Sequence, residues 1–248
     1  MASITPDFAV QSYCFRNIKD NAAAAKAVRE IGLNKIELCG VHCAFDKPET
    51  FASVIDIYRQ AGVQIVSIGV EGMNGDEAAM IRRFDFVKAA GAKHISVNFS
   101  PNTFDAVHPV VQKLAEKYDV RCGIHNHGGY HWLGNSEMLR YLFTQVGDRI
   151  GLCMDTAWAL AAWQDPVKMV QEFGKRLWAV HLKDFVFHGP TGKHEDVIVG
   201  TGNLKLKEFI AALNEANFSG QAIMEYEGDP ENPIPTLGKC VTAIRAAL

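Results

Sequence analysis

The stretch Cys122-Gly-Ile-His-Asn-His-Gly-Gly129 is a short apolar run that becomes polar at its C-terminal end. In a buried parallel strand the side chains alternate, so His125 and His127 would project to the same side where the strand ends. Three later runs have the same build, and each ends near a residue able to bind a metal: Gly151-Leu-Cys-Met-Asp155, Leu177-Trp-Ala-Val-His-Leu-Lys183 and Ala222-Ile-Met-Glu225. These runs predict a site at which several strand ends converge.

Strand-like runs alternate with helical patterns along the whole chain. The expected strands are Ala9–Phe15, Lys35–Cys39, Val63–Val70, His94–Ser100, Val120–His125, Ile150–Asp155, Leu177–Lys183 and Gln221–Glu227. The expected helices are 21–31, 48–62, 76–90, 105–118, 136–146, 166–173, 204–216 and 235–248. Eight β-then-α units in a chain of 248 residues predict an α/β protein with a single (β/α)₈ TIM-barrel domain spanning 1–248.

Local signals support these helix boundaries. Asp20 or Asn21 is a suitable N-cap for the first helix, and Gly32 is suited to end it. Pro48 is suited to the first turn of the second helix. The longest connection, Asp184 to Asn203, is rich in Gly, His and charge, which predicts an active-site loop.

Composition narrows the class of protein. Hydrophobic residues make up 48% and charged residues 21%, which excludes a disordered or fibrous chain. The formal net charge of -3 disfavours a nucleic-acid partner. The six cysteines lie mostly in apolar runs and are expected to be reduced. Neither a signal sequence nor an apolar run of about 18 residues is evident, so we expect no membrane partner and a cytoplasmic location.

Polar residues gather at the predicted strand ends, whereas the strand beginnings look comparatively bland. The residues at the ends are Glu37, Glu71, Asn98, His125, His127, Asp155, His181, Lys183, Glu225 and Glu227. Barrel enzymes carry their sites at this face, and desolvating such groups without a function costs free energy.

Four of these residues form the candidate metal site: His125, Asp155, His181 and Glu225, from four consecutive predicted strands. Two imidazoles and two carboxylates suit one divalent Mn, Co, Fe or Zn ion, and Mg is also compatible. A lone histidine that ends a strand is more often a hydrogen-bonded structural residue. Four such residues in succession favour the metal interpretation.

The chain resembles the xylose-isomerase-like TIM-barrel superfamily, which includes sugar isomerases, tagatose-type epimerases, inosose dehydratase and endonuclease IV enzymes. The motifs that carry the resemblance are Gln11-Ser-Tyr-Cys-Phe-Arg16, Ile36-Glu-Leu38, His125-Asn-His-Gly128, Asp155-Thr156, His181-Leu-Lys-Asp184, Gly200-Thr-Gly202 and Glu225-Tyr-Glu227. Members of this superfamily hold one divalent metal with Glu, Asp, His and Glu, and Asp155, His181 and Glu225 match the last three.

Two departures from the pattern bear on the reaction. His125 stands where the epimerases carry their first glutamate, as in the inosose-dehydratase-like branch, and this removes half of a two-base epimerase mechanism. Trp158 stands where relatives often have a histidine that touches substrate. The resemblance therefore implies one-base enolisation or elimination more readily than two-base epimerisation.

The leading hypothesis is a metal-dependent sugar isomerase or epimerase that removes a proton next to a carbonyl through an enediolate. The candidate catalytic residues are His127, Lys183 and Glu225, with Glu227 as a further candidate base. His127 is the best-poised base, with a hydrogen bond to a metal ligand as the alternative role. Lys183 is better suited to hold a substrate oxygen than to act as a base.

The substrate is expected to be a small sugar or keto-sugar. Glu37, Glu71 and Glu227 are candidates to bind it at the barrel mouth, although salt bridges to loop lysines or arginines would equally explain Glu37 and Glu71. Trp158 is a candidate for an apolar wall, and Trp132 and Phe185 are weaker ones. For each aromatic residue the alternative is ordinary packing beneath a loop.

Other functions compete with this hypothesis. A metal-dependent lyase acting on a keto-inositol or a 3-keto-glycoside would share the enediolate, and the loss of the first glutamate favours it. An endonuclease IV-like repair enzyme would need three zinc ions and a cationic groove, for which the ligands and net charge give no support. A non-catalytic sugar-binding barrel is the remaining alternative. The resemblance also implies a homo-oligomer, although no helix pattern identifies an interface.

Overall fold

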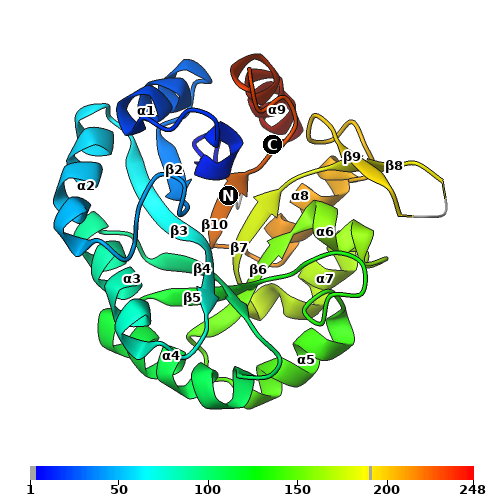
Figure 1. Ribbon diagram of the computed structural model, residues 1–248. Helices are drawn as coiled ribbons and strands as arrows, with labels where there is room; N and C mark the ends of the chain where they lie inside the picture. The colour runs from blue at the N-terminus through cyan, green and yellow to red at the C-terminus, as the bar shows by residue number, and fades with distance from the viewer. Residues whose placement is uncertain (1–3, 190–191) are drawn as a thin grey trace.

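The computed structural model describes residues 4–189 and 192–248, and in this part eight parallel strands close into a barrel ringed by helices (Figure 1). The barrel strands are β1 (Ala9–Gln11), β2 (Lys35–Leu38), β3 (Gln64–Met73), β4 (His94–Phe99), β5 (Arg121–His125), β6 (Ile150–Asp155), β7 (Leu177–Leu182) and β10 (Gln221–Met224). They pair in chain order, and β1 closes the barrel against β10. The predicted TIM barrel is confirmed.

The helices form the outer layer of the barrel. They are α1 (Asn21–Glu30), α2 (Phe51–Gln60), α3 (Glu77–Ala90), α4 (Phe104–Tyr118), α5 (Ser136–Gln145), α6 (Thr156–Ala161), α7 (Pro166–Phe173), α8 (Leu206–Glu215) and α9 (Ile234–Ala247). Short 3₁₀ helices lie at η1 (Ser12–Phe15), η2 (Pro48–Thr50) and η3 (Gly174–Arg176). The expected cap is present, because Asp20 accepts a hydrogen bond from the backbone N–H of Ala23 at 2.8 Å.

Three local predictions differ from the structure. The first strand ends at Gln11, because the side chain of Gln11 accepts a hydrogen bond from Tyr13 N and starts η1. A short helix that we did not predict, α6, follows β6 directly. The predicted loop between Asp184 and Asn203 contains an antiparallel hairpin, β8 (Phe185–Phe187) with β9 (His194–Asp196), which projects beyond the helical ring in Figure 1. Residues 190 and 191 of that loop lie outside the described residues.

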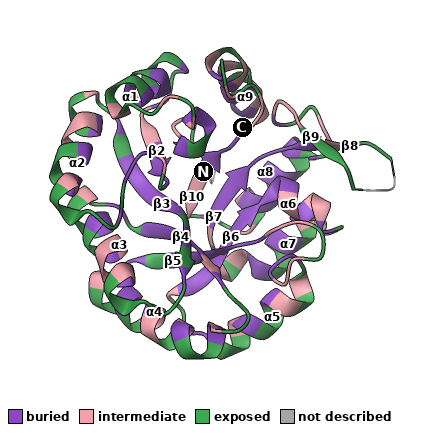
Figure 2. Ribbon diagram, in the orientation of Figure 1, coloured by how far each residue is buried: buried purple, intermediate pink, exposed green. Residues whose placement is uncertain are grey.

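Two apolar clusters of different size stabilise the barrel. The large cluster packs the helices against the outer faces of the strands, and Figure 2 shows buried positions on the strands and on the inner sides of the helices. The small cluster consists of Ala9, Val66, Cys153, Ala179 and Ile223, which come from five barrel strands. Because these side chains are mostly short, they leave room for polar groups among them. All six cysteines are buried and free, as expected.

Polar residues also occupy strand beginnings inside the barrel, so the expectation that this end would be bland is wrong. His94 begins β4 and is 2% exposed, and its Nδ1 lies 2.9 Å from the Ser67 hydroxyl on β3. Gly123 on β5 makes room for this ring, since a Cβ at Gly123 would lie 2.7 Å from His94 Nε2. Along each strand, side chains point alternately into and out of the barrel. His94, Ser67 and Gly123 occupy inward-pointing positions on their strands, as His125 does on β5.

Within the described ranges, no helix combines the length and the apolar character needed to cross a membrane.

Candidate metal centre

Four side chains converge at the C-terminal end of the barrel, as the sequence predicted. His125 ends β5, Asp155 ends β6, His181 lies near the end of β7, and Glu225 directly follows β10. Each offers one ligand atom, and these four atoms lie within 4.8 Å of one another. All four residues are buried. The barrel therefore gathers two imidazoles and two carboxylates in a space the size of a metal site.

The local sequence positions Asp155 for two contacts. Its Oδ1 accepts the Trp158 N–H at 2.8 Å and caps α6, which begins at the next residue. Its Oδ2 has no hydrogen-bond partner among the described residues and lies 3.7 Å from His125 Nε2. One carboxylate oxygen thus starts the helix, and the other is left facing the cluster.

Unpartnered buried atoms show that the cluster fits a cation. His125 is 3% exposed, and neither of its ring nitrogens has a hydrogen-bond partner within the described chain. Buried nitrogen and oxygen atoms are normally satisfied, because leaving them unpaired costs about 1–3 kcal/mol each. A divalent ion that accepts mixed N and O ligands would satisfy His125 and Asp155 together.

The protonation states in this cluster follow from burial and from neighbouring charges. Burial, together with the nearby His181 and His127, places the pKa of His125 well below its usual value, so this ring is neutral and can act as a ligand. Burial also raises the pKa of Asp155 to about 7 against the opposing effect of Lys183. Burial would raise the pKa of Glu225, but Lys183 and His181 outweigh it and lower that pKa.

His181 faces a carboxylate on each side of its ring. Nδ1 lies 2.7 Å from Glu225 Oε2, within the ligand cluster. Nε2 lies 2.9 Å from Glu37 Oε1 on the opposite side, although this approach is not aligned as a hydrogen bond. Burial lowers the pKa of His181, but the carboxylates of Glu37 and Glu225, together with the Cys153 sulfur that lies against the ring, outweigh burial and raise it well above its usual value.

Lys183 lies beside the cluster as a buried cation. It is 1% exposed, and its Nζ pairs with Glu227 and lies 3.6 Å from Glu225 Oε1. Burial lowers the pKa of Lys183, but the surrounding carboxylates Glu225, Asp155 and Glu227 raise it more. The amine is therefore charged at neutral pH, which suits the holding of an anionic oxygen rather than proton abstraction.

His127 follows β5 on the same side as His125, with 5.0 Å between the ring centroids. Its Nε2 lies 3.2 Å from Asn98 Nδ2, and the ring of His131 lies 4.6 Å away. Burial and His131 lower the pKa of His127 to about 4, so the ring is neutral at pH 7. Beside it, Gly128 lets the chain pass Trp158, where a Cβ would lie 2.7 Å from the indole.

Two glutamates expected at the barrel mouth are paired within the protein. Glu37 is 0% exposed inside the barrel, where both of its carboxylate oxygens accept hydrogen bonds from Gln11, Ser67 and Ser96. Glu71 lies within β3, which extends further than expected, and its Oε2 pairs with Arg83 Nε at 2.6 Å. Glu71 therefore forms a salt bridge, which was the alternative to substrate binding. The arginine comes from α3 rather than from a loop.

Aromatic rings from α6 and the hairpin pack together beside Lys183. The ring of Trp158 lies 5.0 Å from that of Phe185, and Phe185 stacks on His194 at 4.1 Å. Lys183 Nζ lies 5.4 Å from the Trp158 ring centroid. Trp132 is placed differently, because its indole N–H donates to the Phe99 carbonyl at 3.1 Å and its ring packs on Phe104. Trp132 therefore packs within the protein, which was the alternative to forming a wall against the substrate.

Two residues that support the cluster were not identified from the sequence. Asn126 is fully buried, and its amide bonds the backbone N–H and C=O of Asp155 at 2.8 and 3.1 Å. The Thr156 hydroxyl donates to the backbone carbonyl of Lys183 at 2.5 Å. Both lie next to predicted ligands, and this adjacency was the available signal.

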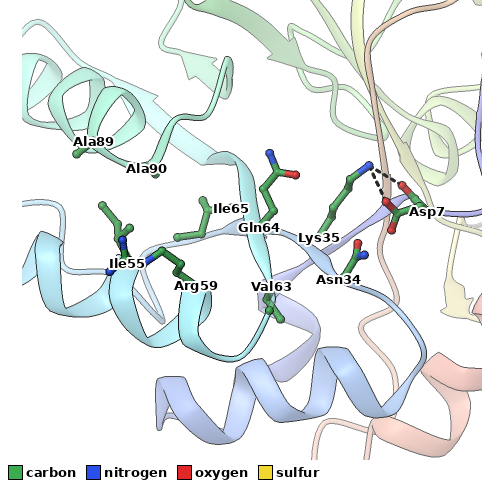
Figure 3. A pocket seen from close by; sticks show the side chains of 11 residues that line it. Asp7, Asn34, Lys35, Ile55, Arg59, Val63, Gln64, Ile65, Ala89 and Ala90 are labelled. Carbon is green, nitrogen blue, oxygen red and sulfur yellow. Dashed lines mark hydrogen bonds and ion pairs between the residues drawn. The ribbon is translucent and has the colours of Figure 1, made fainter.

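At the other end of the barrel, the described residues form no second cluster of side chains that could hold a metal ion. A hollow of about 440 Å³ lies where β2 and β3 begin (Figure 3), lined by residues that include Lys35, Gln64 and Arg59. Lys35 points to Asp7 there, with 3.0 Å between Nζ and Oδ2. We therefore place the candidate site at the C-terminal strand ends.

Comparison with known proteins identifies a family and relatives of this chain. Residues 22–244 match the family model described as xylose isomerase-like TIM barrel. Inosose dehydratase of Lacticaseibacillus casei is 23% identical over 195 residues, which cover 64% of this chain and 65% of the relative. The chain thus spans about two thirds of the length of that relative.

Solved structures show the same fold at low sequence identity. The crystal structure of the IOLI protein with a binding zinc atom has a TM-score of 0.76 at 15% identity, covering 97% of this chain and 98% of that one. D-allulose 3-epimerase from Methylomonas sp. has a TM-score of 0.75 at 15% identity, covering 98% of both chains. At this identity the similarity concerns the fold.

Proposed function

Because the chain belongs to the xylose isomerase-like TIM barrel family, we propose that it is a divalent-metal-dependent sugar isomerase or epimerase. The reaction would begin with removal of a proton from the carbon next to a carbonyl group. The single observation that carries this proposal is the cluster of His125, Asp155, His181 and Glu225, with ligand atoms within 4.8 Å of one another.

The donor set supports Mn, Co, Fe or Zn, and Mg is compatible. A divalent cation held by these four residues would supply a Lewis acid that polarises neighbouring substrate oxygens. The side chains around it would bind the substrate and move the proton.

His127 is the proposed base. Its ring is neutral at pH 7 because burial and His131 lower its pKa to about 4, and it lies beside His125 with 5.0 Å between centroids. Asn98 holds the ring through a contact to Nε2 at 3.2 Å. The lone pair that would accept the substrate proton is the one that Nε2 directs at the Asn98 amide, so this contact would break as the proton arrives. The pKa of about 4 makes the ring a weaker base than a histidine that titrates near neutrality.

Glu225 is the proposed second group for proton transfer. Lys183 and His181 lower its pKa, so its carboxylate would take a proton from one substrate hydroxyl and return it to the neighbouring oxygen of the enediolate.

Lys183 and Glu227 are the proposed contacts for the substrate oxygens. Because the Lys183 amine is charged and buried, it would stabilise the negative oxygen that develops as the proton leaves. Glu227 is partly exposed and would accept hydrogen bonds from sugar hydroxyls while keeping Lys183 in place. Trp158 and Phe185 would cover the apolar face of the sugar ring.

A dehydratase or related lyase is the second candidate. The similarity to an inosose dehydratase favours it, and so does His125, since a neutral imidazole replaces one of the two bases of an epimerase. Proton removal would be the same, but a hydroxyl or a glycosidic group would then leave the adjacent carbon. The substrate would be a keto-inositol or a 3-keto-glycoside.

Metal content tests the proposed site directly. Purified wild-type protein should contain about one divalent ion per chain by mass spectrometry, as expected for a four-ligand site. His181→Ala and Glu225→Ala should lose that ion, because each removes one ligand. A wild-type protein that neither contains a metal nor binds one on addition would exclude the proposed function.

Product analysis separates the two candidates. The metal-loaded protein would be incubated with ketoses, inososes and 3-keto-glycosides in deuterated water and followed by NMR. Deuterium in a rearranged product without loss of any group supports an isomerase or epimerase. Release of water or of an aglycone supports the lyase.

A further inference from the structure

The carboxylate behind His181 has no role in the proposed reaction. Glu37 is 0% exposed and lies on the side of the His181 ring opposite Glu225, with its Oε1 2.9 Å from Nε2. It is not among the four residues of the cluster. Its position therefore requires a separate explanation.

Glu37 on β2 is held in a fixed position by side chains from three other strands, β1, β3 and β4. Gln11 Nε2 donates to Oε1 at 2.5 Å. The hydroxyls of Ser67 and Ser96 donate to Oε2 at 2.5 and 2.8 Å. Ser67 in turn contacts His94 Nδ1 at 2.9 Å. Every donor in this arrangement is buried, so the carboxylate cannot turn away from His181.

Such an arrangement is costly in a barrel interior. Burying a carboxylate carries a desolvation penalty of several kcal/mol, and an apolar side chain would fill the same volume without it. A role toward the adjacent imidazole offsets this cost. Histidines that bind metals commonly donate their second ring N–H to a carboxylate, which selects the tautomer and raises the basicity of the coordinating nitrogen.

We propose that Glu37 is the positioning residue of the metal centre, holding the proton of His181 on Nε2 so that Nδ1 presents its lone pair beside Glu225. This inference rests on the metal site of the proposed function. It assigns Glu37 no contact with the substrate or with the metal. The clamp made by Gln11, Ser67 and Ser96 keeps Oε1 2.9 Å from Nε2, so rotation of the imidazole is what would align its N–H with the carboxylate.

The Cys153 thiol is the rival partner for this nitrogen. It belongs to the small apolar cluster in the barrel, lies against His181 and receives the Ser96 hydroxyl at 3.3 Å. Burial raises the pKa of Cys153, so the thiol is neutral and a weak acceptor. Glu37 is the charged acceptor within reach, which makes it the stronger partner.

The test measures zinc affinity by calorimetry on metal-stripped protein that is then reloaded. Glu37→Gln keeps the shape of the side chain: its carbonyl can accept from Gln11 and His181, and its amide can donate to Ser67 and Ser96. Losing the charge should weaken zinc binding by about 10–100-fold, the range for outer partners of metal ligands. The melting temperature of the metal-free variant checks that it folds.

Two control variants separate this role from general damage to the barrel. Glu71→Gln makes the same change at another buried glutamate, which pairs with Arg83 and does not contact His181. Its zinc affinity should match that of the wild type. Cys153→Ala removes the rival acceptor and should also leave the affinity within about twofold, because the neutral thiol contributes little to the tautomer.

A measurement on the wild type covers the case in which Glu37→Gln does not fold. Nitrogen NMR of the zinc-loaded protein should show His181 protonated on Nε2. A proton on Nδ1 would overturn the inference. So would a zinc affinity of Glu37→Gln equal to that of the wild type, or a large loss of zinc affinity in Cys153→Ala alone. A wild type without saturable zinc binding would overturn both this inference and the proposed function, whereas the other failures leave the proposed function standing.

Discussion

At the scale of single residues, the proposed metal centre depends on side chains that make two different contacts at once. Asp155 shows this most clearly, since Oδ1 caps α6 at Trp158 N and Oδ2 faces His125. A cap needs only an acceptor oxygen, whereas a metal ligand needs a free carboxylate oxygen. The two contributions can therefore be separated by substitution.

We expect Asp155→Asn to lose zinc binding but to keep the helix cap. The amide oxygen can still accept from Trp158 N, while the amide nitrogen that would replace Oδ2 cannot bind a metal. Zinc affinity should fall by more than ~100-fold, beyond the range for outer partners. Calorimetry and denaturant unfolding of the metal-free protein measure the two effects.

Asp155→Ala is the matched comparison, because it removes the cap as well as the ligand. The metal-free alanine variant should be less stable than the asparagine variant by about 1 kcal/mol, the usual value of an N-cap. Equal stabilities of the two variants would show that the cap at Trp158 contributes nothing.

At the scale of elements, the connection after β7 is organised by Asp184. This buried side chain accepts backbone N–H groups from Gly200 and Leu204, at 3.0 and 2.8 Å, and from Gly202 at 2.8 Å. Gly202 permits the approach, since a Cβ there would lie 2.7 Å from Asp184 Oδ1. One carboxylate thus fastens the end of the loop beside the metal centre and supports the hairpin that precedes it.

Asp184→Ala should release this connection while leaving the barrel folded. Hydrogen bonds to a charged acceptor contribute roughly 1.5–3 kcal/mol each, so losing three should increase local opening at least about tenfold. Limited proteolysis should then cut within 185–203 at least about ten times faster than in the wild type.

Glu195→Gln on the hairpin provides the control for that experiment. It removes only the exposed pair between His188 and Glu195, whose side chains are 51% and 70% exposed. Its cleavage rate should match the wild type. A resistant Asp184→Ala protein would mean that the connection is held by the backbone pairing of β8 and β9 instead.

At the scale of the whole molecule, the barrel interior contains titratable groups along much of its length. His94 lies near one end, Glu37 lies behind His181, and the four-residue cluster lies at the other end. Burial lowers the pKa of His94 to about 4, against an ordinary value of 6.5. The folded protein therefore resists a proton that the unfolded chain would accept, and acid should destabilise the fold through this residue.

His94→Asn tests this dependence in the metal-free protein. Asparagine can keep the contact to Ser67 but does not titrate. Since the folded-state pKa is below the unfolded one, the contribution of His94 to stability is complete above pH 6.5 and is lost as pH falls toward 4. The folded-state pKa of about 4 and the ordinary pKa of 6.5 differ by about 2.5, which corresponds to about 3 kcal/mol of unfolding free energy.

Unfolding free energies measured from pH 7.5 to pH 4 should therefore fall less steeply in His94→Asn than in the wild type, by about 3 kcal/mol over the range. Parallel curves would contradict the buried, neutral state of His94.

The barrel and the four-residue cluster could be predicted from the sequence, because both depend on short-range patterns. Alternating β-like runs and capped helices predict the eight β-then-α units, and polar residues that end those runs predict His125, Asp155, His181 and Glu225. Parallel strands in a closed barrel bring their C-terminal ends to one face, so a list of strand ends is already a list of neighbours.

The partners of those ligands were decided by the tertiary structure. Whether Glu37 lies at the mouth or behind His181 depends on strand register and on how far each strand extends, and the run Ile36-Glu-Leu38 looks the same in both cases. The pairing of Glu71 with Arg83 depends likewise on how α3 packs on β3. The sequence by itself determined which groups reach the barrel end, and the closure of the barrel decided which of them face one another.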